Sequence, residues 1–168
     1  MFRFQRLSVA KSSFSFLLQM MSESKYKKYI IEAKLPVQES SGALESKRDH
    51  SRLIYLDDKV IKGAFYVECV WVWPVVGVYP HDVELQAHKH DYDEVITFFG
   101  SNPEDPLDLC GEVELWLEDE KQILTKSCLI FVPKGMKHCP LRVIRVDKPI
   151  FHFSVGTGGI YKKLYDIC

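Results

Sequence analysis

A series of short strand-like segments, separated by turn residues, constrains the fold of this chain more than any other feature. Turn signals such as Asp57-Asp58 and Asp147-Lys148-Pro149 lie between the segments. Many short strands at regular spacing predict an all-β sandwich or barrel. The segments are 52–56, 64–73, 94–99, 112–117, 122–125, 128–132, 141–146 and 150–155.

The side-chain pattern of three segments predicts which faces are buried. In 112–118, Val113, Leu115 and Leu117 share one face, and mainly glutamates occupy the other, so one side packs and the other is largely solvated. Segment 64–73 is apolar on both faces, which predicts a central strand buried on both sides. Segment 128–132 is apolar throughout and is expected to be buried as well.

Length, charge and hydropathy exclude several classes of protein. The chain has 168 residues, of which 46% are hydrophobic, enough for one domain with a sizeable core. Its 22 basic and 23 acidic residues offer no positive excess to hold a phosphate backbone, so we expect no nucleic-acid partner. No apolar run is long enough to span a bilayer, so we expect no membrane partner either.

The five cysteines indicate thiols rather than a disulfide framework. Their number is odd and no C-x-x-C pair occurs, which favours a reducing, cytoplasmic compartment. Cys139 directly follows His138. Neighbours in a strand point to opposite faces, so we expect Cys139 to pack rather than to bind a metal.

The N-terminus differs in composition from the rest of the chain. Residues 1–21 contain Arg3, Arg6 and Lys11, several serines and no acidic residue. We interpret 1–21 as a flexible extension or a targeting segment, with a mitochondrial location as the alternative to the cytoplasm. Residues 22–168 then form a single β-barrel domain, with a first strand expected within 25–34.

Two segments, 88–94 and 133–138, carry the candidate chemistry. His88 and His90 share one face of a strand, and Glu94 stays on that face if the strand continues. Pro133 ends the preceding strand and Gly135 permits a tight turn, which places His138 at the start of the next strand. Three imidazoles and one carboxylate suit a divalent transition metal and leave coordination positions free.

These segments resemble the two motifs of the cupin superfamily, G-x5-H-x-H-x3,4-E-x6-G and G-x5-P-x-G-x2-H-x3-N. His88, His90, Glu94 and His138 fall on the four metal-ligand positions. The chain departs from the motifs at turn or packing positions, with Asp82 and Ser127 for glycine, Arg142 for asparagine, and Gly100 one residue early. The resemblance implies an all-β, cupin-type double-stranded β-helix, also called a jelly-roll barrel, with a bound metal.

The resemblance also implies a reaction class. We expect an Fe(II)-dependent oxidoreductase of dioxygenase type, with Mn, Ni, Zn or Cu as other candidate ions. Its substrate would be a small phenolic, polyketide-like or keto-acid molecule, for example in secondary-metabolite biosynthesis. The alternatives are a non-redox isomerase, decarboxylase or cyclase, and a small-molecule-binding cupin without turnover.

Other residues have more local interpretations. Glu94 and Tyr92 are the candidate catalytic residues, since Tyr92 lies between ligand positions. His152 is interpreted as a hydrogen-bonded strand histidine rather than a fifth ligand. A β-rich chain with an exposed edge strand often pairs that edge with a second copy, so we expect a homodimer.

Overall fold

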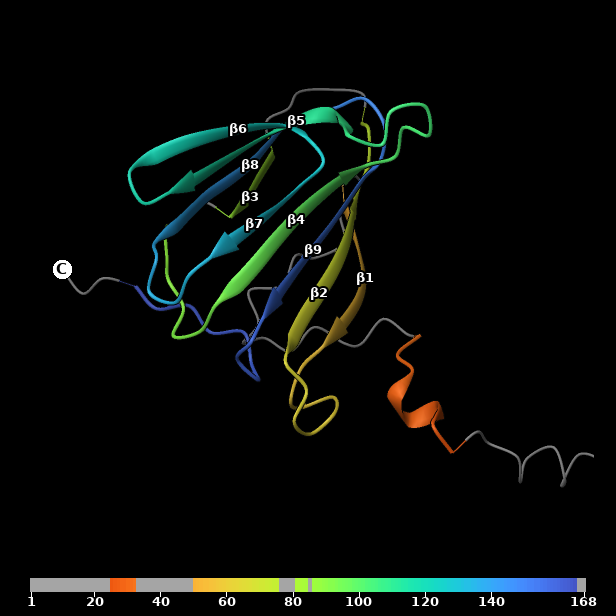
Figure 1. The fold of residues 1–168 in the computed structure, drawn as a ribbon, viewed down its shortest axis with the longest axis vertical. Helices are drawn as coiled ribbons and strands as arrows, with labels where there is room; N and C mark the ends of the chain where they lie inside the picture. Colours follow the sequence, from red (N-terminus) through yellow and green to blue (C-terminus); the bar gives the residue numbers. More distant parts are fainter. Residues whose placement is uncertain (1–24, 33–49, 76–80, 85, 166–168) are drawn as a thin grey trace, which may run out of the picture. The chain divides into compact units, whose positions relative to one another are not determined.

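The computed structural model describes residues 25–32, 50–75, 81–84 and 86–165, with 81–84 described for the backbone alone (Figure 1). The extension expected at 1–21 lies outside these residues, as do the last two residues of segment 25–34. The chain divides into two compact units, Met1–Ile31 and Glu32–Cys168. No helix in the described ranges is long and apolar enough to cross a membrane.

The prediction of a strand within 25–34 is wrong for the part of that segment that the structure describes, residues 25–32. The first unit has instead a short 3-10 helix, η1 (Lys27–Tyr29). The backbone N–H groups of Tyr29 and Ile30 donate to carbonyls three residues earlier, each at 3.0 Å. No residue of η1 is buried, so the alternation of charged and apolar residues noted for segment 25–34 does not produce a packed face here.

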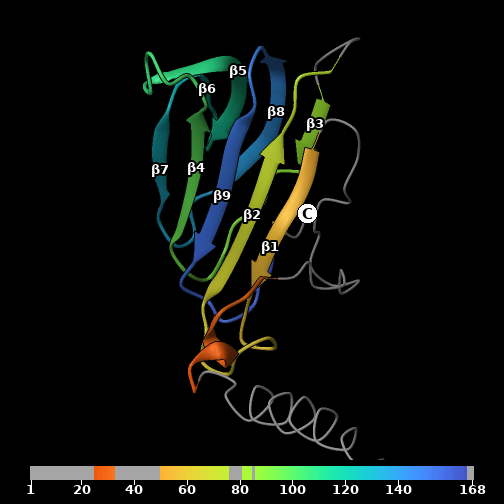
Figure 2. The ribbon, with the colours of Figure 1, turned by 90° about the vertical axis from the view of Figure 1, so that its right-hand side faces the viewer.

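The second unit is built from two antiparallel sheets (Figure 2). One sheet has the order β1-β2-β9-β4-β7, with β1 (His50–Leu56), β2 (Tyr66–Val72), β9 (Ile150–Gly156), β4 (Glu94–Gly100) and β7 (Cys128–Val132). The other has the order β3-β8-β5-β6, with β3 (His81–Glu84), β8 (His138–Val146), β5 (Asp108–Leu117) and β6 (Glu120–Lys126). β1 and β2, like β5 and β6, are consecutive in the chain, whereas the other neighbouring strands are distant in sequence because the chain crosses between the sheets.

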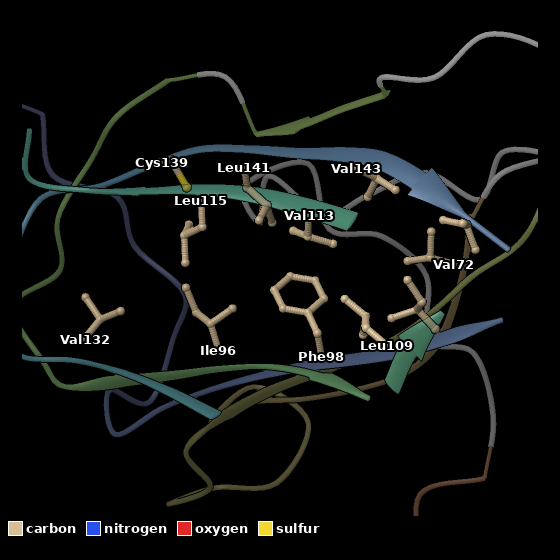
Figure 3. Close-up of a cluster of buried hydrophobic side chains, with 12 residues drawn as sticks. Val72, Ile96, Phe98, Leu109, Val113, Leu115, Val132, Cys139, Leu141 and Val143 are labelled. Atoms are coloured by element: carbon tan, nitrogen blue, oxygen red, sulfur yellow. The ribbon is translucent and has the colours of Figure 1, made fainter. Parts of the chain in front are cut away.

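This arrangement confirms the predicted all-β jelly roll, a double-stranded β-helix. Apolar side chains from the two sheets meet in the space between them (Figure 3). Ile96 and Phe98 point inward from β4, and Val113 and Leu115 point inward from β5, following the two-residue period of a strand. Cys139 belongs to the same core and is 5% exposed, so its predicted packing role is confirmed.

The predicted burial of two strands is wrong. β2 buries alternate residues such as Tyr66 and Val70, whereas its other face is only half-buried, and Phe65 just before it is 53% exposed. β7 lies at the edge of its sheet and exposes 65% of Leu129 and 62% of Phe131. The apolar composition of both segments correctly indicated that they form strands. It does not indicate whether a second layer of structure covers the outer face of the sheet.

Sequence reasoning assigned no strand to 81–84, where β3 pairs with β8.

The cysteines behave as expected within the described part of the chain. Cys69, Cys110, Cys128 and Cys139 are free thiols.

Candidate metal centre

The backbone of the first motif, residues 88–94, differs from the continuous strand that was expected. The strand does not continue from His88 to Glu94, because the chain bends at Asp91 and Tyr92, and β4 begins only at Glu94. Glu94 nevertheless faces the interior, since it starts the inward alternation that continues through Ile96 and Phe98. The carboxylate is therefore aligned by the sheet and the two histidines by the preceding loop.

The second motif forms the tight turn that was predicted. Gly135 has φ +83°, a conformation that favours glycine, and Met136 N–H donates to Pro133 O at 3.0 Å. This turn is tied to the first motif by two hydrogen bonds. Gly135 N–H donates to His90 O at 2.9 Å, and Lys134 N–H donates to Asp93 Oδ1 at 2.8 Å.

The fold brings the four proposed ligands together. His88, His90 and His138 each offer a ring nitrogen, and these atoms lie within 4.8 Å of one another. Oε2 of Glu94 lies 3.3 Å from Nε2 of His90 and 3.2 Å from Nε2 of His138. All four residues are at most 3% exposed, so the cluster is shielded from water.

Backbone carbonyls orient each imidazole. Nδ1 lies 2.9 Å from Gln86 O in His88, 2.6 Å from Lys162 O in His90 and 3.3 Å from Met136 O in His138. A carbonyl can only accept, so Nδ1 carries the hydrogen in each ring. Nε2 is then the atom left to bind a cation, which is the arrangement that metal-binding histidines commonly have.

The electrostatics of the cluster also fit a cation. Burial opposes ionisation of Glu94, but the imidazoles of His138 and His90 beside its carboxylate outweigh this effect and hold its pKa at about 2. Burial lowers the pKa of His88 to about 4, so this ring is neutral at pH 7. For His90, the Glu94 carboxylate overcomes the opposing effect of burial and raises the pKa.

Two atoms of the cluster lack a well-oriented hydrogen bond. His90 Nε2 and Glu94 Oε2 are buried, and no described group hydrogen-bonds to either. A raised pKa at His90 means that the cluster attracts a proton, and a divalent ion would compete for the same position. The donor set, its shielding and these two atoms therefore fit a divalent transition metal.

Tyr92 lies against the ligands. Its ring stacks on His90 with the centroids 4.8 Å apart and the planes at 6°, and burial raises its pKa to about 12. Its hydroxyl accepts a hydrogen bond from Lys162 N–H at 3.3 Å. A Cβ added to Gly156 or Gly158 would come within 2.4 or 2.2 Å of the Tyr92 ring, so both glycines permit this close approach. These contacts orient His90; a catalytic role for Tyr92 stays a proposal.

His152 lies outside the cluster. Its Nδ1–H donates to Thr97 O at 2.7 Å, and its ring stacks on Phe98 with the centroids 4.7 Å apart. Burial lowers its pKa. These contacts agree with its interpretation as a hydrogen-bonded strand histidine.

Sequence reasoning missed the C-terminal segment 158–165, here called the strap. Lys89 and Leu164 exchange backbone hydrogen bonds of 2.9 and 2.8 Å, and the strap supplies the Lys162 carbonyl to His90. Tyr161 on the strap places its hydroxyl 3.3 Å from Nε2 of His88. Nothing in the spacing of these residues marks them, because each contact joins positions far apart in the chain.

A cavity of about 890 Å³ adjoins the strap. Tyr92 and Tyr161 line it and also contact the ligand histidines. The other lining residues are Asp58, Lys59, Asp91, Gly158, Gly159, Ile160, Lys162, Lys163 and Tyr165.

Two antiparallel sheets packed on a shared apolar core, with an inward histidine cluster, define a cupin-type double-stranded β-helix, which confirms the resemblance at the level of the fold. Solved structures with this type of fold match the chain. A recombinant oxalate oxidase in complex with glycolate is 12% identical, with 86% of this chain and 67% of that chain covered and a TM-score of 0.49. A double-stranded β-helix protein from Klebsiella pneumoniae is 13% identical, with coverages of 74% and 90% and a TM-score of 0.45.

A third match is a cupin superfamily sugar phosphate isomerase from Silicibacter pomeroyi. It is 20% identical, with 64% of this chain and 59% of that chain covered and a TM-score of 0.41. No protein-family model and no curated protein sequence matches the chain.

Proposed function

We propose that this protein is a metal-dependent oxidoreductase of dioxygenase type that acts on a small phenolic, polyketide-like or keto-acid molecule. The observation that carries the proposal is the tethering of all three histidines through Nδ1, which aims three Nε2 atoms and one carboxylate oxygen at a common centre. Four protein ligands leave positions for exogenous molecules on an ion that accepts six.

An Fe(II) ion held there would supply the means to activate dioxygen next to a bound substrate. The chain's own residues prepare the site for this role. Glu94 adds one negative charge, which favours a higher oxidation state of a bound metal. The backbone carbonyls fix the three imidazoles, and the buried surroundings keep bulk water away.

Metal analysis together with oxygen uptake tests the proposal. Purified protein should carry iron, and oxygen should be consumed with at least one member of a panel of catechols, salicyl compounds and β-diketones. Metal-dependent conversion under nitrogen would instead support a non-redox isomerase, decarboxylase or cyclase. Tight binding of a panel member without conversion in either atmosphere would support a binding protein.

The remaining expectations form part of the same proposal. The partner is a small molecule, the assembly is a homodimer, and the chain acts in the cytoplasm unless residues 1–21 direct it to mitochondria. Residues 22–168 form the barrel domain.

A further inference from the structure

Tyr161 lies between the histidine cluster and the cavity beside the strap. Its hydroxyl is 3.3 Å from Nε2 of His88, and its ring centroid is 5.2 Å from that of His90. The same tyrosine lines the cavity of about 890 Å³. Tyr161 therefore contacts both the histidine cluster and the cavity.

The direction of the hydrogen bond follows from the His88 tautomer. Nδ1–H of His88 donates to Gln86 O, so Nε2 carries the lone pair and Tyr161 O–H is the donor. The hydroxyl is thus directed at the atom that would bind a cation. A cation on Nε2 takes this lone pair, and the hydroxyl then needs another acceptor at the same place.

The strap holds Tyr161 in position. Leu164 is paired with Lys89 through two backbone hydrogen bonds, and Lys162 N–H donates to Tyr92. The Tyr161 ring also packs on Tyr66 with the centroids 4.8 Å apart. Because contacts on both sides fix the backbone and the ring, the hydroxyl stays at the border of the cluster.

We propose that Tyr161 donates a hydrogen bond to an oxygen atom of the molecule bound at the metal centre, and so selects small oxygen-donor anions such as carboxylates. The inference rests on the metal site of the proposed function but not on its reaction. An O–H donor pairs best with an ionised oxygen, and a buried donor without an acceptor is unfavourable. Lys163 adds positive charge near the Tyr161 ring, with its Nζ 5.7 Å from the ring centroid.

Cobalt(II) offers a test with a readout other than turnover, since its visible spectrum responds to each new ligand. The metal-loaded protein is titrated with oxalate, an oxygen-donor anion, and with imidazole, a neutral nitrogen donor that needs no hydrogen bond from Tyr161. Tyr161→Phe removes one oxygen atom and keeps the ring contacts. We expect it to weaken oxalate binding about tenfold, in the range of one hydrogen bond to a charged group, and to leave imidazole binding within about twofold.

Tyr165→Phe is the matched control, because Tyr165 also lines the cavity and its ring centroid is as far from that of His88 as the Tyr161 centroid is, 6.4 Å, whereas the hydroxyl that reaches Nε2 of His88 is that of Tyr161. It should leave both affinities unchanged. Equal oxalate affinity in wild type and Tyr161→Phe would overturn the role of Tyr161 and leave the metal site standing. A wild-type protein that takes up no cobalt would overturn the metal site itself, and with it both proposals. An equal loss for oxalate and imidazole would show that Tyr161 acts on the site's shape rather than as a donor.

Discussion

His88 and His138 form an isolated antiparallel bridge in which each donates its backbone N–H to the other's carbonyl, at 3.0 and 2.9 Å. The bridge joins the loop of the first motif to the first residue of β8. It places the two imidazoles side by side, with their centroids 4.4 Å apart. The backbone thus sets the spacing of these two proposed ligands in the absence of an ion, which would lower the conformational cost of binding one.

Removing either histidine of this bridge should abolish metal binding. We expect wild-type protein to retain about one divalent ion per chain after dialysis, and His88→Ala or His138→Ala to retain almost none, because each removes one of only four protein ligands. Elemental analysis of the dialysed proteins measures this. His152→Phe is the control, since His152 lies outside the cluster. Full metal content in a His90→Ala, Glu94→Ala double variant would refute the ligand assignment.

Glu94→Gln should separate metal binding from reactivity. The amide keeps the shape of the side chain but removes its negative charge, and ligand charge affects the potential of a metal as well as its affinity. We expect part of the metal to remain and most of the oxygen-dependent turnover to disappear. Elemental analysis and oxygen uptake on the same preparation give both values. Unchanged turnover per bound ion would contradict the role given to this carboxylate.

Gly158→Ala should disturb the centre through Tyr92. The new methyl group would lie 2.2 Å from the Tyr92 ring, which stacks on His90. We expect a stability loss of about 1–3 kcal/mol from overpacking, together with weaker metal binding. Chemical denaturation and a chelator competition measure the two effects. Gly159→Ala is the matched control, because its Cβ would approach only to 3.2 Å of the Asp58 side chain. Equal behaviour of the two variants would contradict this role of Tyr92.

Because of His152, the free energy of unfolding of the metal-free protein should fall as the pH is lowered. Burial lowers its pKa in the folded state, so below about pH 6.5 the unfolded chain binds a proton that the folded chain does not. The stability that the neutral ring contributes is present above pH 6.5 and is lost as the pH falls, with a slope of at most about 1.4 kcal/mol per pH unit. His152→Phe should remove this component. Denaturant unfolding of both proteins between pH 4 and 7 tests it, and parallel curves would contradict it.

The exposed edge of the five-stranded sheet favours a homodimer. Leu129 and Phe131 on edge strand β7 are 65% and 62% exposed, and such an edge pairs readily with another strand. We expect light scattering to give the mass of a dimer for the wild type and of a monomer for a Leu129→Lys, Phe131→Glu double variant. Leu107→Lys, at a loop residue that is 66% exposed, should remain dimeric. A monomeric wild type would refute the assembly.

The sequence correctly predicted features that depend on local patterns. Alternating apolar residues predicted β4, β5 and β9 to within a few residues, because a two-residue period is imposed by the strand itself. It was less successful with burial. The exposure of Phe131 depends on whether a second layer covers the outer face of the sheet, and no local pattern contains that information.

By itself, the sequence determined the all-β class and predicted His88, His90, Glu94 and His138 as metal ligands, since donor type and short spacing are properties of neighbouring residues. The tertiary structure alone decided how these ligands are oriented and what surrounds them. The Lys162 carbonyl that fixes His90 and the Tyr161 hydroxyl beside His88 come from the far end of the chain. Such contacts form only when folding brings distant backbone groups together to satisfy their hydrogen bonds in the interior.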